Sequence, residues 1–241
     1  MNIPPVDGLL SPQDGSTMSL PWSVGDTWTG LGLLVLIEAV ILILVLVFKP
    51  PNIYGTFMAV ILEMAYVFPA VMILAVRGGN WRLFGFHKFD ASSLGLGCGL
   101  VVAAYFISLI NNLVFHYLGV KLQSDLLLQL MSSLRTPYWL VLSAVIVAPI
   151  VEESFFRGFL FAGFRQAYGW NRAALLSSLV FAIGHLELAA LIPTFLLGYI
   201  FSYIYHRSNS IWPGVILHFL VNAFGMFVIL LSLHFGHLTP R

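Results

Sequence analysis

The residues best suited to chemistry in this chain are two adjacent glutamates, Glu152 and Glu153, which Arg157 follows in an otherwise apolar stretch. Charged side chains are costly at membrane depth unless they are paired or reached by water, so they indicate function there. Residues four apart share a helix face, whereas neighbours point about 100° apart. We therefore expect Glu153 and Arg157 to form an ion pair, which leaves Glu152 free to act as a general base. The alternative is that both acids pair with distant partners and only hold the helices together.

Two further polar sites follow within apolar runs. His185 lies four residues after Phe181, and Asn222 lies four residues after His218, so the members of each pair should share a helix face. His218 and Asn222 could then both donate to the oxyanion of a tetrahedral intermediate. His185 could share a water molecule with Glu152 and help to deprotonate it. The alternative for each histidine taken alone is a hydrogen-bonded tie between helices.

The ordered set resembles the motifs of the CPBP family of intramembrane proteases, which includes CAAX-processing endopeptidases and bacteriocin-immunity-type members. The family pattern is Glu-Glu-x-x-x-Arg, then Phe-x-x-x-His, then His-x-x-x-Asn or Asp. The chain reads Glu152-Glu153-Ser-Phe-Phe-Arg157, Phe181-Ala-Ile-Gly-His185 and His218-Phe-Leu-Val-Asn222. The resemblance covers residues 138–233. It implies hydrolysis of a peptide bond, with Glu152 and His185 activating water, His218 and Asn222 as oxyanion donors, and Glu153, Arg157 and Phe181 in support.

The resemblance also raises the question of a metal, because the family is commonly labelled metalloprotease although a metal-free glutamate mechanism is argued for it. Glu152, His185 and His218 would supply a carboxylate and two imidazoles, a ligand set that zinc accepts in open catalytic sites. The chain has no His-Glu-x-x-His motif that would place two ligands on one helix. A glutamate that binds the metal could not also serve as the base. We therefore expect the metal-free mechanism, with zinc as the alternative cofactor.

The composition explains where such a site would have to lie. The 241 residues are 59% hydrophobic and 9% charged, against about 25% charged residues in an ordinary soluble domain. The apolar runs lack strand alternation, and lipid permits only helices or closed barrels. We therefore predict an all-α, polytopic transmembrane helical bundle. The net charge of +1 gives no reason to expect a nucleic-acid partner.

The elements that must position the site are apolar runs of about 20 residues, the length that crosses a bilayer. Candidate spans run over residues 30–48, 54–76, 94–116, 138–156, 172–187, 189–206 and 212–233. These predict a bundle of about seven to eight spans, with Glu187 in a tight turn between the fifth and sixth. Residues 118–135 alternate apolar and charged positions, which is typical of an amphipathic helix on the membrane surface.

The predicted organisation has four parts. A mobile polar tail covers residues 1–29, where prolines disfavour a helix. Residues 30–137 hold the amino-terminal spans and the surface helix, residues 138–233 the catalytic core, and residues 234–241 a short tail. Glu38 and Glu63 lie inside the first two spans, but no motif surrounds them, and we expect each to pair with another helix. Gly95, Gly97 and Gly99 are expected to allow close helix packing.

These patterns favour a multi-pass intramembrane endopeptidase in the cell membrane, with a peptide or a membrane protein as substrate and the lipid bilayer as surroundings. A prenylated substrate is implied by one branch of the family only. Two other functions remain open. One is a non-catalytic membrane scaffold or bacteriocin-immunity-type protein that uses the same fold, and the other is a small transporter whose buried Glu and His residues relay protons. The sequence does not indicate an oligomeric state.

Overall fold

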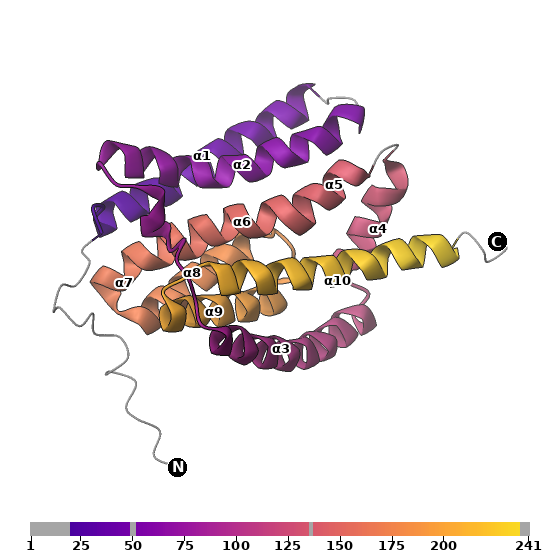
Figure 1. Ribbon diagram of the computed structural model, residues 1–241. Coiled ribbons are helices and arrows are strands. Elements are labelled where there is room, and N and C mark those ends of the chain that lie inside the picture. Colours follow the sequence, from indigo (N-terminus) through magenta and orange to yellow (C-terminus); the bar gives the residue numbers. More distant parts are fainter. Residues whose placement is uncertain (1–19, 49–51, 135–136, 237–241) are drawn as a thin grey trace, which may run out of the picture.

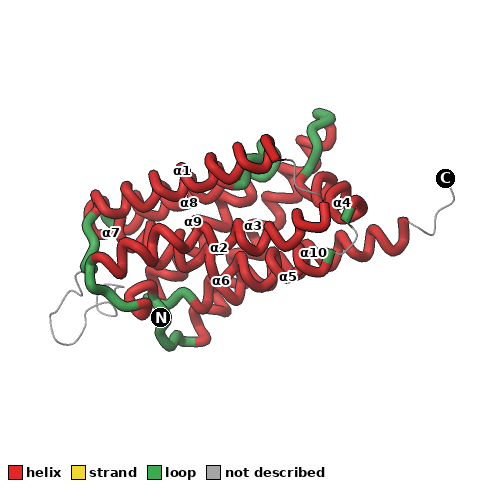
Figure 2. Tube along the Cα trace, turned by 90° about the horizontal axis from the view of Figure 1, so that it is seen from above, coloured by secondary structure: helices red, strands yellow, loops and turns green. Residues whose placement is uncertain are grey.

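The computed structural model describes residues 20–48, 52–134 and 137–236, and this part of the chain consists of helices joined by turns, with no strand (Figures 1 and 2). The first half contains α1 (Val24–Phe48), α2 (Asn52–Val76), the short helix η2 (Trp81–Phe84), α3 (Ala91–Tyr117) and α4 (Gln123–Ser133). One long helical run then joins α5 (Tyr138–Leu142), η3 (Ser143–Val147), α6 (Ala148–Glu153), η4 (Ser154–Phe161) and α7 (Ala162–Tyr168). The chain closes with α8 (Trp170–Gly184), α9 (Leu191–Ser208) and α10 (Trp212–Gly236).

Within the described residues, four helical stretches are long and apolar enough to cross a membrane. They are Val24–Phe48, Ala91–Tyr117, Tyr138–Tyr168 and Trp212–Phe235. The protein is thus an all-α, multi-pass integral membrane protein, as the composition predicts. The α8 helix has only 15 residues, which span about 22 Å and fall short of the roughly 30 Å hydrocarbon core. The total of seven to eight spans therefore stays a prediction.

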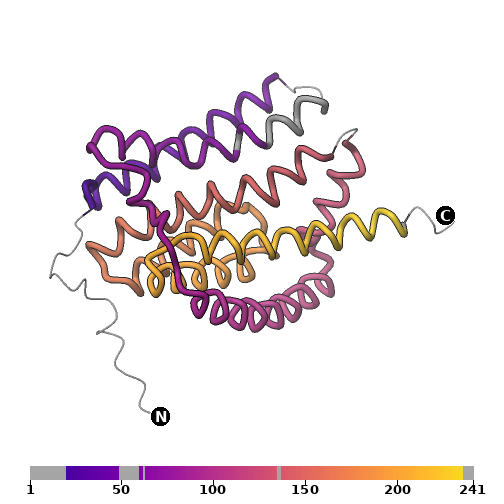
Figure 3. Tube along the Cα trace, viewed as in Figure 1, coloured from indigo at the N-terminus to yellow at the C-terminus, as the bar shows by residue number. Residues whose placement is uncertain are grey.

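The helices are arranged so that the motif-bearing run lies in the middle of the bundle. In Figures 1 and 3, α1 and α2 form a pair on one side of this run, and α8, α9, α10 and α3 lie on the other. The α2 and α10 helices both pack directly against α6, while α8 packs on α9 and α9 on α3. Residues of α6 therefore face helices from both halves of the chain.

The central run departs from regular α-helical geometry at two places. Residues Ser143–Val147 and Ser154–Phe161 are π-helical, a feature that often marks functional sites. Pro149 gives a physical reason for the first π-helical turn, because its ring collides with the carbonyl four residues earlier and it has no N–H to donate. The turn is wide enough for the Ala148 amide to donate to Ser143, five residues earlier.

The prediction that the fourth span ends at residue 156 is wrong. The helical run continues to Tyr168, and Arg157 and the residues that follow it, up to Phe164, are almost completely buried. In the sequence, Arg157 indicates the start of a loop, because a charged residue usually marks the end of a transmembrane span. Its ion pair with Glu153 allows that charge to be buried, so the helix does not need to end there.

The amino-terminal boundary also differs from the prediction, because α1 begins at Val24 rather than at residue 30. The Ser23 amide donates to Asp26, and the Asp26 amide donates to the Ser23 hydroxyl, a reciprocal capping arrangement that starts the helix. Trp22 is buried in the core, so the predicted polar tail of residues 1–29 ends earlier than expected. Residues 1–19 of that tail lie outside the described residues.

Two other predicted segments are helical. The predicted surface helix at 118–135 contains α4, which packs through Met131 on Met226 and Ile229 of α10. The α10 helix extends to Gly236, so the predicted tail at 234–241 begins inside it. Residues 237–241 lie outside the described residues. Glu187 lies between α8 and α9, as predicted, and Leu186 beside it has a positive φ of 54°.

Close packing through glycine is more selective than the sequence indicates. On α3, a Cβ at Gly97 would collide with Leu217, whereas one at Gly95 or Gly99 would meet nothing within 4 Å. The closest contact to backbone involves Gly158 of the central run. A Cβ there would lie 2.7 Å from both the Cβ and the carbonyl oxygen of Phe84, so glycine lets η2 approach the run.

We predict that Gly158→Ala lowers the melting temperature in detergent by several degrees, because the methyl group forces backbone apart at a cost of about 1–3 kcal/mol. Gly99→Ala is the matched control in another helix, since its methyl group points into open space. Its expected effect is neutral or slightly stabilising, because alanine favours helix. Equal melting temperatures for both variants would contradict the close approach of η2.

Candidate active site

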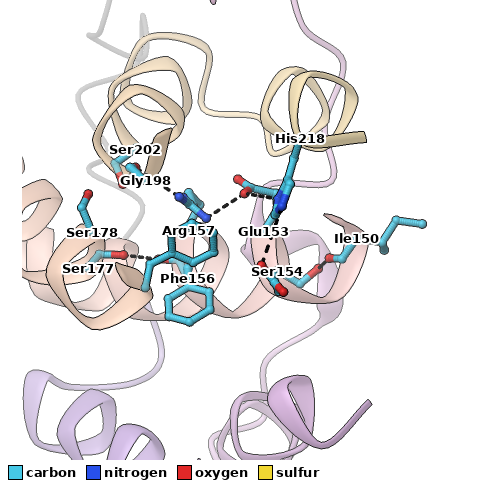
Figure 4. Close-up of polar contacts among 12 residues, drawn as sticks. Ile150, Glu153, Ser154, Phe156, Arg157, Ser177, Ser178, Gly198, Ser202 and His218 are labelled. Atoms are coloured by element: carbon cyan, nitrogen blue, oxygen red, sulfur yellow. Dashed lines mark hydrogen bonds and ion pairs between the residues drawn. The ribbon is translucent and has the colours of Figure 1, made fainter. Parts of the chain in front are cut away.

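The centre of the site is a buried ion pair between Glu153 and Arg157 (Figure 4). Arg157 Nη1 lies 2.7 Å from Glu153 Oε1, and the two side chains are 0% and 1% exposed. The guanidinium also donates from Nη2 to the Gly198 carbonyl at 3.1 Å and lies 4.7 Å from the centroid of the Phe181 ring. A buried charge needs both a partner and hydrogen bonds. Glu153 Oε1 and the Gly198 carbonyl supply them to the two terminal nitrogens of the guanidinium, whereas Arg157 Nε and Glu153 Oε2 are buried without a partner among the described residues. The predicted pairing of Glu153 with Arg157 is thus confirmed.

His218 of α10 joins both glutamates. Its Nδ1 lies 3.3 Å from Glu153 Oε1, and its Nε2 lies 3.8 Å from Glu152 Oε2. Because an ionised carboxylate only accepts hydrogen bonds, Nδ1 must carry the proton that it shares with Glu153. The second nitrogen, Nε2, therefore faces Glu152. A Cβ at Gly214, one turn earlier, would lie 2.6 Å from Glu153 Oε2, so a glycine is needed there for α10 to approach α6.

Glu152 differs from its neighbour in both exposure and pairing. Its side chain is 13% exposed, against 1% for Glu153. Glu152 Oε2 is buried and has no hydrogen-bond partner among the described residues. Glu153 Oε2 is also buried without a partner in the described part of the chain, so the arginine, which bonds to Glu153 Oε1, is what separates the two acids, as the helix geometry predicts.

His185 lies at the carboxyl end of α8, in the position that caps the helix. Its Nδ1 lies 2.8 Å from the Phe181 carbonyl oxygen. A carbonyl only accepts, so Nδ1 donates and Nε2 is the nitrogen left for another partner. The Phe181 ring packs against His185, His218 and the Arg157 guanidinium. The water that we expect His185 to share with Glu152 stays a prediction.

Asn222 has a partner that the sequence does not indicate. Its amide nitrogen donates to the Ala144 carbonyl at 2.8 Å, in the first π-helical turn. The Ala148 amide, the usual α-helical donor to this carbonyl, bonds to Ser143 instead, and Pro149, the next residue along, has no N–H. Asn222 therefore bonds to a backbone carbonyl that has no helical N–H donor, partly because Pro149 lacks an N–H. One N–H of the amide remains for another acceptor, so its oxyanion role stays a prediction.

The site also includes acidic residues that the motif analysis set aside. Glu38 Oε1 on α1 and Glu63 Oε2 on α2 are buried and have no hydrogen-bond partner among the described residues. The α2 helix that carries Glu63 packs against both α1, which carries Glu38, and α6, which carries Glu152. The expectation that each of these two acids pairs with another helix is therefore not met in the described part of the chain. Their depth within an apolar span is the sequence signal that could have found them.

The residues named for the alternative zinc cofactor are not gathered into one metal site in the described part of the chain. Across the described ranges, no three His, Cys, Asp or Glu side chains are grouped so that they could hold a metal ion. Glu152 and His218 face each other, but His185 does not complete a ligand set with them. The ligand set of that alternative thus does not fit a metal in this arrangement, so we derive no chemical step through one, and the metal-free mechanism stays a prediction.

The comparisons with known proteins agree with the motifs on the class of protein. Residues 134–224 match the family model described as Type II CAAX prenyl endopeptidase Rce1-like. These residues contain all three motifs, so the chain carries an Rce1-like region and the predicted resemblance to CPBP intramembrane proteases is confirmed. No solved structure matches the chain.

Three curated proteins are similar to parts of the chain. "Putative membrane peptidase YdiL" of Bacillus subtilis is 26% identical over 137 residues, which cover 55% of this chain and 56% of that protein. An "Uncharacterized 24.3 kDa protein" of Escherichia coli is 35% identical over 91 residues, 36% of this chain and 42% of the relative. "UPF0177 protein YxdF" of Lactococcus lactis is 32% identical over 96 residues, 39% of this chain and 52% of the relative. The chain thus matches about half the length of these relatives.

The buried ion pair leads to a stability prediction. Arg157→Ala should destabilise the protein by about 3–5 kcal/mol, because it leaves Glu153 as an uncompensated buried charge. Glu152→Gln should change stability by less than about 1 kcal/mol, since the amide keeps the shape of a side chain without an arginine partner. Melting in detergent checks both, with Arg207→Ala on the exposed end of α9 as the matched arginine control. A larger loss for Glu152→Gln than for Arg157→Ala would contradict the assigned pairing.

Asn222 gives a second prediction. Asn222→Asp keeps the size of the side chain but removes both N–H donors, so its carboxylate would oppose the Ala144 carbonyl. We expect a loss of stability of about 1–3 kcal/mol, the usual cost of leaving a buried polar group unpaired. Asn222→Gln keeps an amide donor on a longer side chain and should lose less. Thermal melts that rank the two variants in the opposite order would show that the Ala144 contact does not hold the turn.

Proposed function

We propose that this protein is an intramembrane endopeptidase of the CAAX-protease type, which hydrolyses a peptide bond near the membrane boundary. The observation that carries the proposal is the free Oε2 of Glu152, which faces the His218 imidazole within an Rce1-like region. Glu153 and Arg157 compensate each other beside it. Glu152, which has no arginine partner among the described residues, thus lies beside the His218 imidazole and near the fixed positive charge of Arg157. The Phe181 ring packs against His185, His218 and Arg157.

In the proposed reaction, Glu152 accepts a proton from water while the water oxygen attacks the peptide carbonyl carbon. The carbonyl oxygen becomes an oxyanion, which His218 Nε2 and the remaining N–H of Asn222 would stabilise. His218 can donate from Nε2 only as an imidazolium, and the Glu153 carboxylate against Nδ1 compensates that charge. The carbon–nitrogen bond then breaks, and the proton on Glu152 passes to the leaving nitrogen. The products are a carboxylic acid and an amine, and Glu152 is again ionised.

The same geometry suits the access of water and substrate to Glu152 and the orientation of the attacking water. The partial exposure of Glu152, beside a fully buried Glu153, suits a base that must meet water and substrate. His185 has Nε2 left to hold the attacking water, since Nδ1 is fixed on Phe181. The proposed substrate is a peptide or membrane protein that reaches this depth of the bundle. A prenyl group on the substrate is a narrower extension, which rests on the name of the family model alone.

The test is a comparison of newly formed protein termini in host cells that carry wild-type protein or Glu152→Gln at matched expression. We expect a set of termini to disappear in the variant, because the amide keeps the shape but cannot accept the proton. For a cleavage site found in this way, the rate should fall at least about 100-fold, the lower range for loss of a general base. Asp90→Asn, which removes an exposed carboxylate at the start of α3, is the matched control and should leave the termini unchanged.

The same experiment separates the enzyme from its alternatives. A membrane scaffold or immunity-type protein should keep its cellular effect when Glu152 becomes glutamine, and it should produce no dependent termini. If wild type and Glu152→Gln give identical termini, the catalytic assignment of Glu152 is wrong. A proton-relaying transporter would instead show uptake into vesicles that depends on a proton gradient.

A further inference from the structure

The α2 helix presents a polar face to the motif helices, although it lies outside the Rce1-like region. Glu63 and Tyr66 are three residues apart and therefore share this face. The α2 helix packs against α6 and the π-helical segment that follows it, and the Tyr66 ring centroid lies 6.0 Å from that of Phe156. Tyr66 thus enters the site from the half of the chain that carries no motif.

The Tyr66 hydroxyl lies between α6, which carries the proposed base Glu152, and the end of α8, which His185 caps. A Cβ built on Gly184 would lie 3.8 Å from the hydroxyl oxygen, and no other atom would come within 4 Å of it. Gly184 directly precedes His185 at the end of α8. Phe156, against which the Tyr66 ring packs, lies four residues after Glu152 on the central run. The hydroxyl therefore lies at the His185 turn, and the ring that carries it packs one turn after Glu152 on the central run.

The chemistry of this position suits a hydrogen-bond donor. A phenol hydroxyl has one proton to donate, and that of Tyr66 forms no hydrogen bond with another described residue. Glu152 Oε2 is an acceptor without a donor. Glu38 and Glu63 lie on the same side of Glu152, and their carboxylates offer no fixed donor. On the opposite side, Arg157 and His218 are directed mainly to Glu153.

We propose that Tyr66 is a positioning residue that donates its hydroxyl hydrogen bond to the Glu152 carboxylate. This bond fixes the orientation of the base towards water and shields it from the carboxylates of Glu38 and Glu63. The α2 helix would thereby supply part of the active site. The inference rests on the proposed function, because it assigns Tyr66 to the reaction in which Glu152 is the base.

The test is Tyr66→Phe, which removes only the hydroxyl. The substrate is a synthetic peptide that spans a cleavage site found by the comparison of termini, and the protein is the full chain in proteoliposomes. We expect kcat to fall about 10- to 100-fold, the effect of losing one directed hydrogen bond, with KM within about twofold of wild type. The acid limb of the pH–rate profile should move to higher pH, because the ionised carboxylate loses a donor. A merely structural role would not move that limb.

Tyr199→Phe is the matched control, since it removes a tyrosine hydroxyl that bonds to Asn171 at an exposed position. It should keep the wild-type kcat and pH profile.

A second pair of variants uses Gly184. Gly184→Ala leaves an ordinary contact with the hydroxyl, whereas Gly184→Val adds methyl groups towards it and should lower kcat without unfolding the protein. This pair decides the matter if Tyr66→Phe does not fold.

Each outcome has a definite meaning. Wild-type kcat and pH profile in Tyr66→Phe, while Glu152→Gln is inactive, would overturn the role of Tyr66 and leave the proposed function intact. Equal activity of Gly184→Val and Gly184→Ala would also count against it. Full activity of Glu152→Gln would overturn the proposed function itself. A selective loss of kcat in Tyr66→Phe with a moved acid limb would support both.

Discussion

The arrangement of the site depends on one interaction, the buried ion pair between Glu153 and Arg157. A guanidinium with no exposure survives inside an apolar bundle only because a carboxylate, a backbone carbonyl and aromatic rings surround it. This pair keeps the central run helical beyond the point at which a charge would normally end a span. It also occupies Glu153 and leaves the adjacent Glu152 without an arginine partner.

A second constraint acts on the backbone of the same run. Pro149 lacks an N–H, and the π-helical turn before it leaves the Ala144 carbonyl to be satisfied by Asn222 of α10. His218, one turn earlier on α10, contacts the two glutamates. The α10 helix is therefore attached to the central run at two levels, through the backbone by Asn222 and through the acids by His218. The Ala144 carbonyl is therefore a structural partner of Asn222, whether or not Asn222 also acts in the reaction.

The amino-terminal helices also contribute to this centre. The α2 helix, which carries Glu63 and Tyr66, packs against α6, which carries Glu152. Among the described residues, Glu38 of α1, Glu63 of α2 and both glutamates of α6 each keep a buried oxygen without a hydrogen-bond partner. Such groups are expensive in a low-dielectric bundle, which is the reason to regard this side as part of the site rather than as a lipid-facing cover.

The sequence by itself determined the fold class, the resemblance to CPBP proteases and the local ion pair. Low charge and long apolar runs require a helical membrane protein, and a spacing of four residues is enough to pair Glu153 with Arg157, because local helix geometry fixes both. Only the tertiary structure decided the partners that lie far apart in sequence, namely His218 with the two glutamates, Asn222 with Ala144, and Tyr66 with Phe156. The tertiary structure also decided that the central helical run continues past Arg157. Span ends are predicted from hydropathy, and hydropathy cannot show that a buried partner compensates a charge. Contacts between helices depend on packing, and no local pattern encodes them.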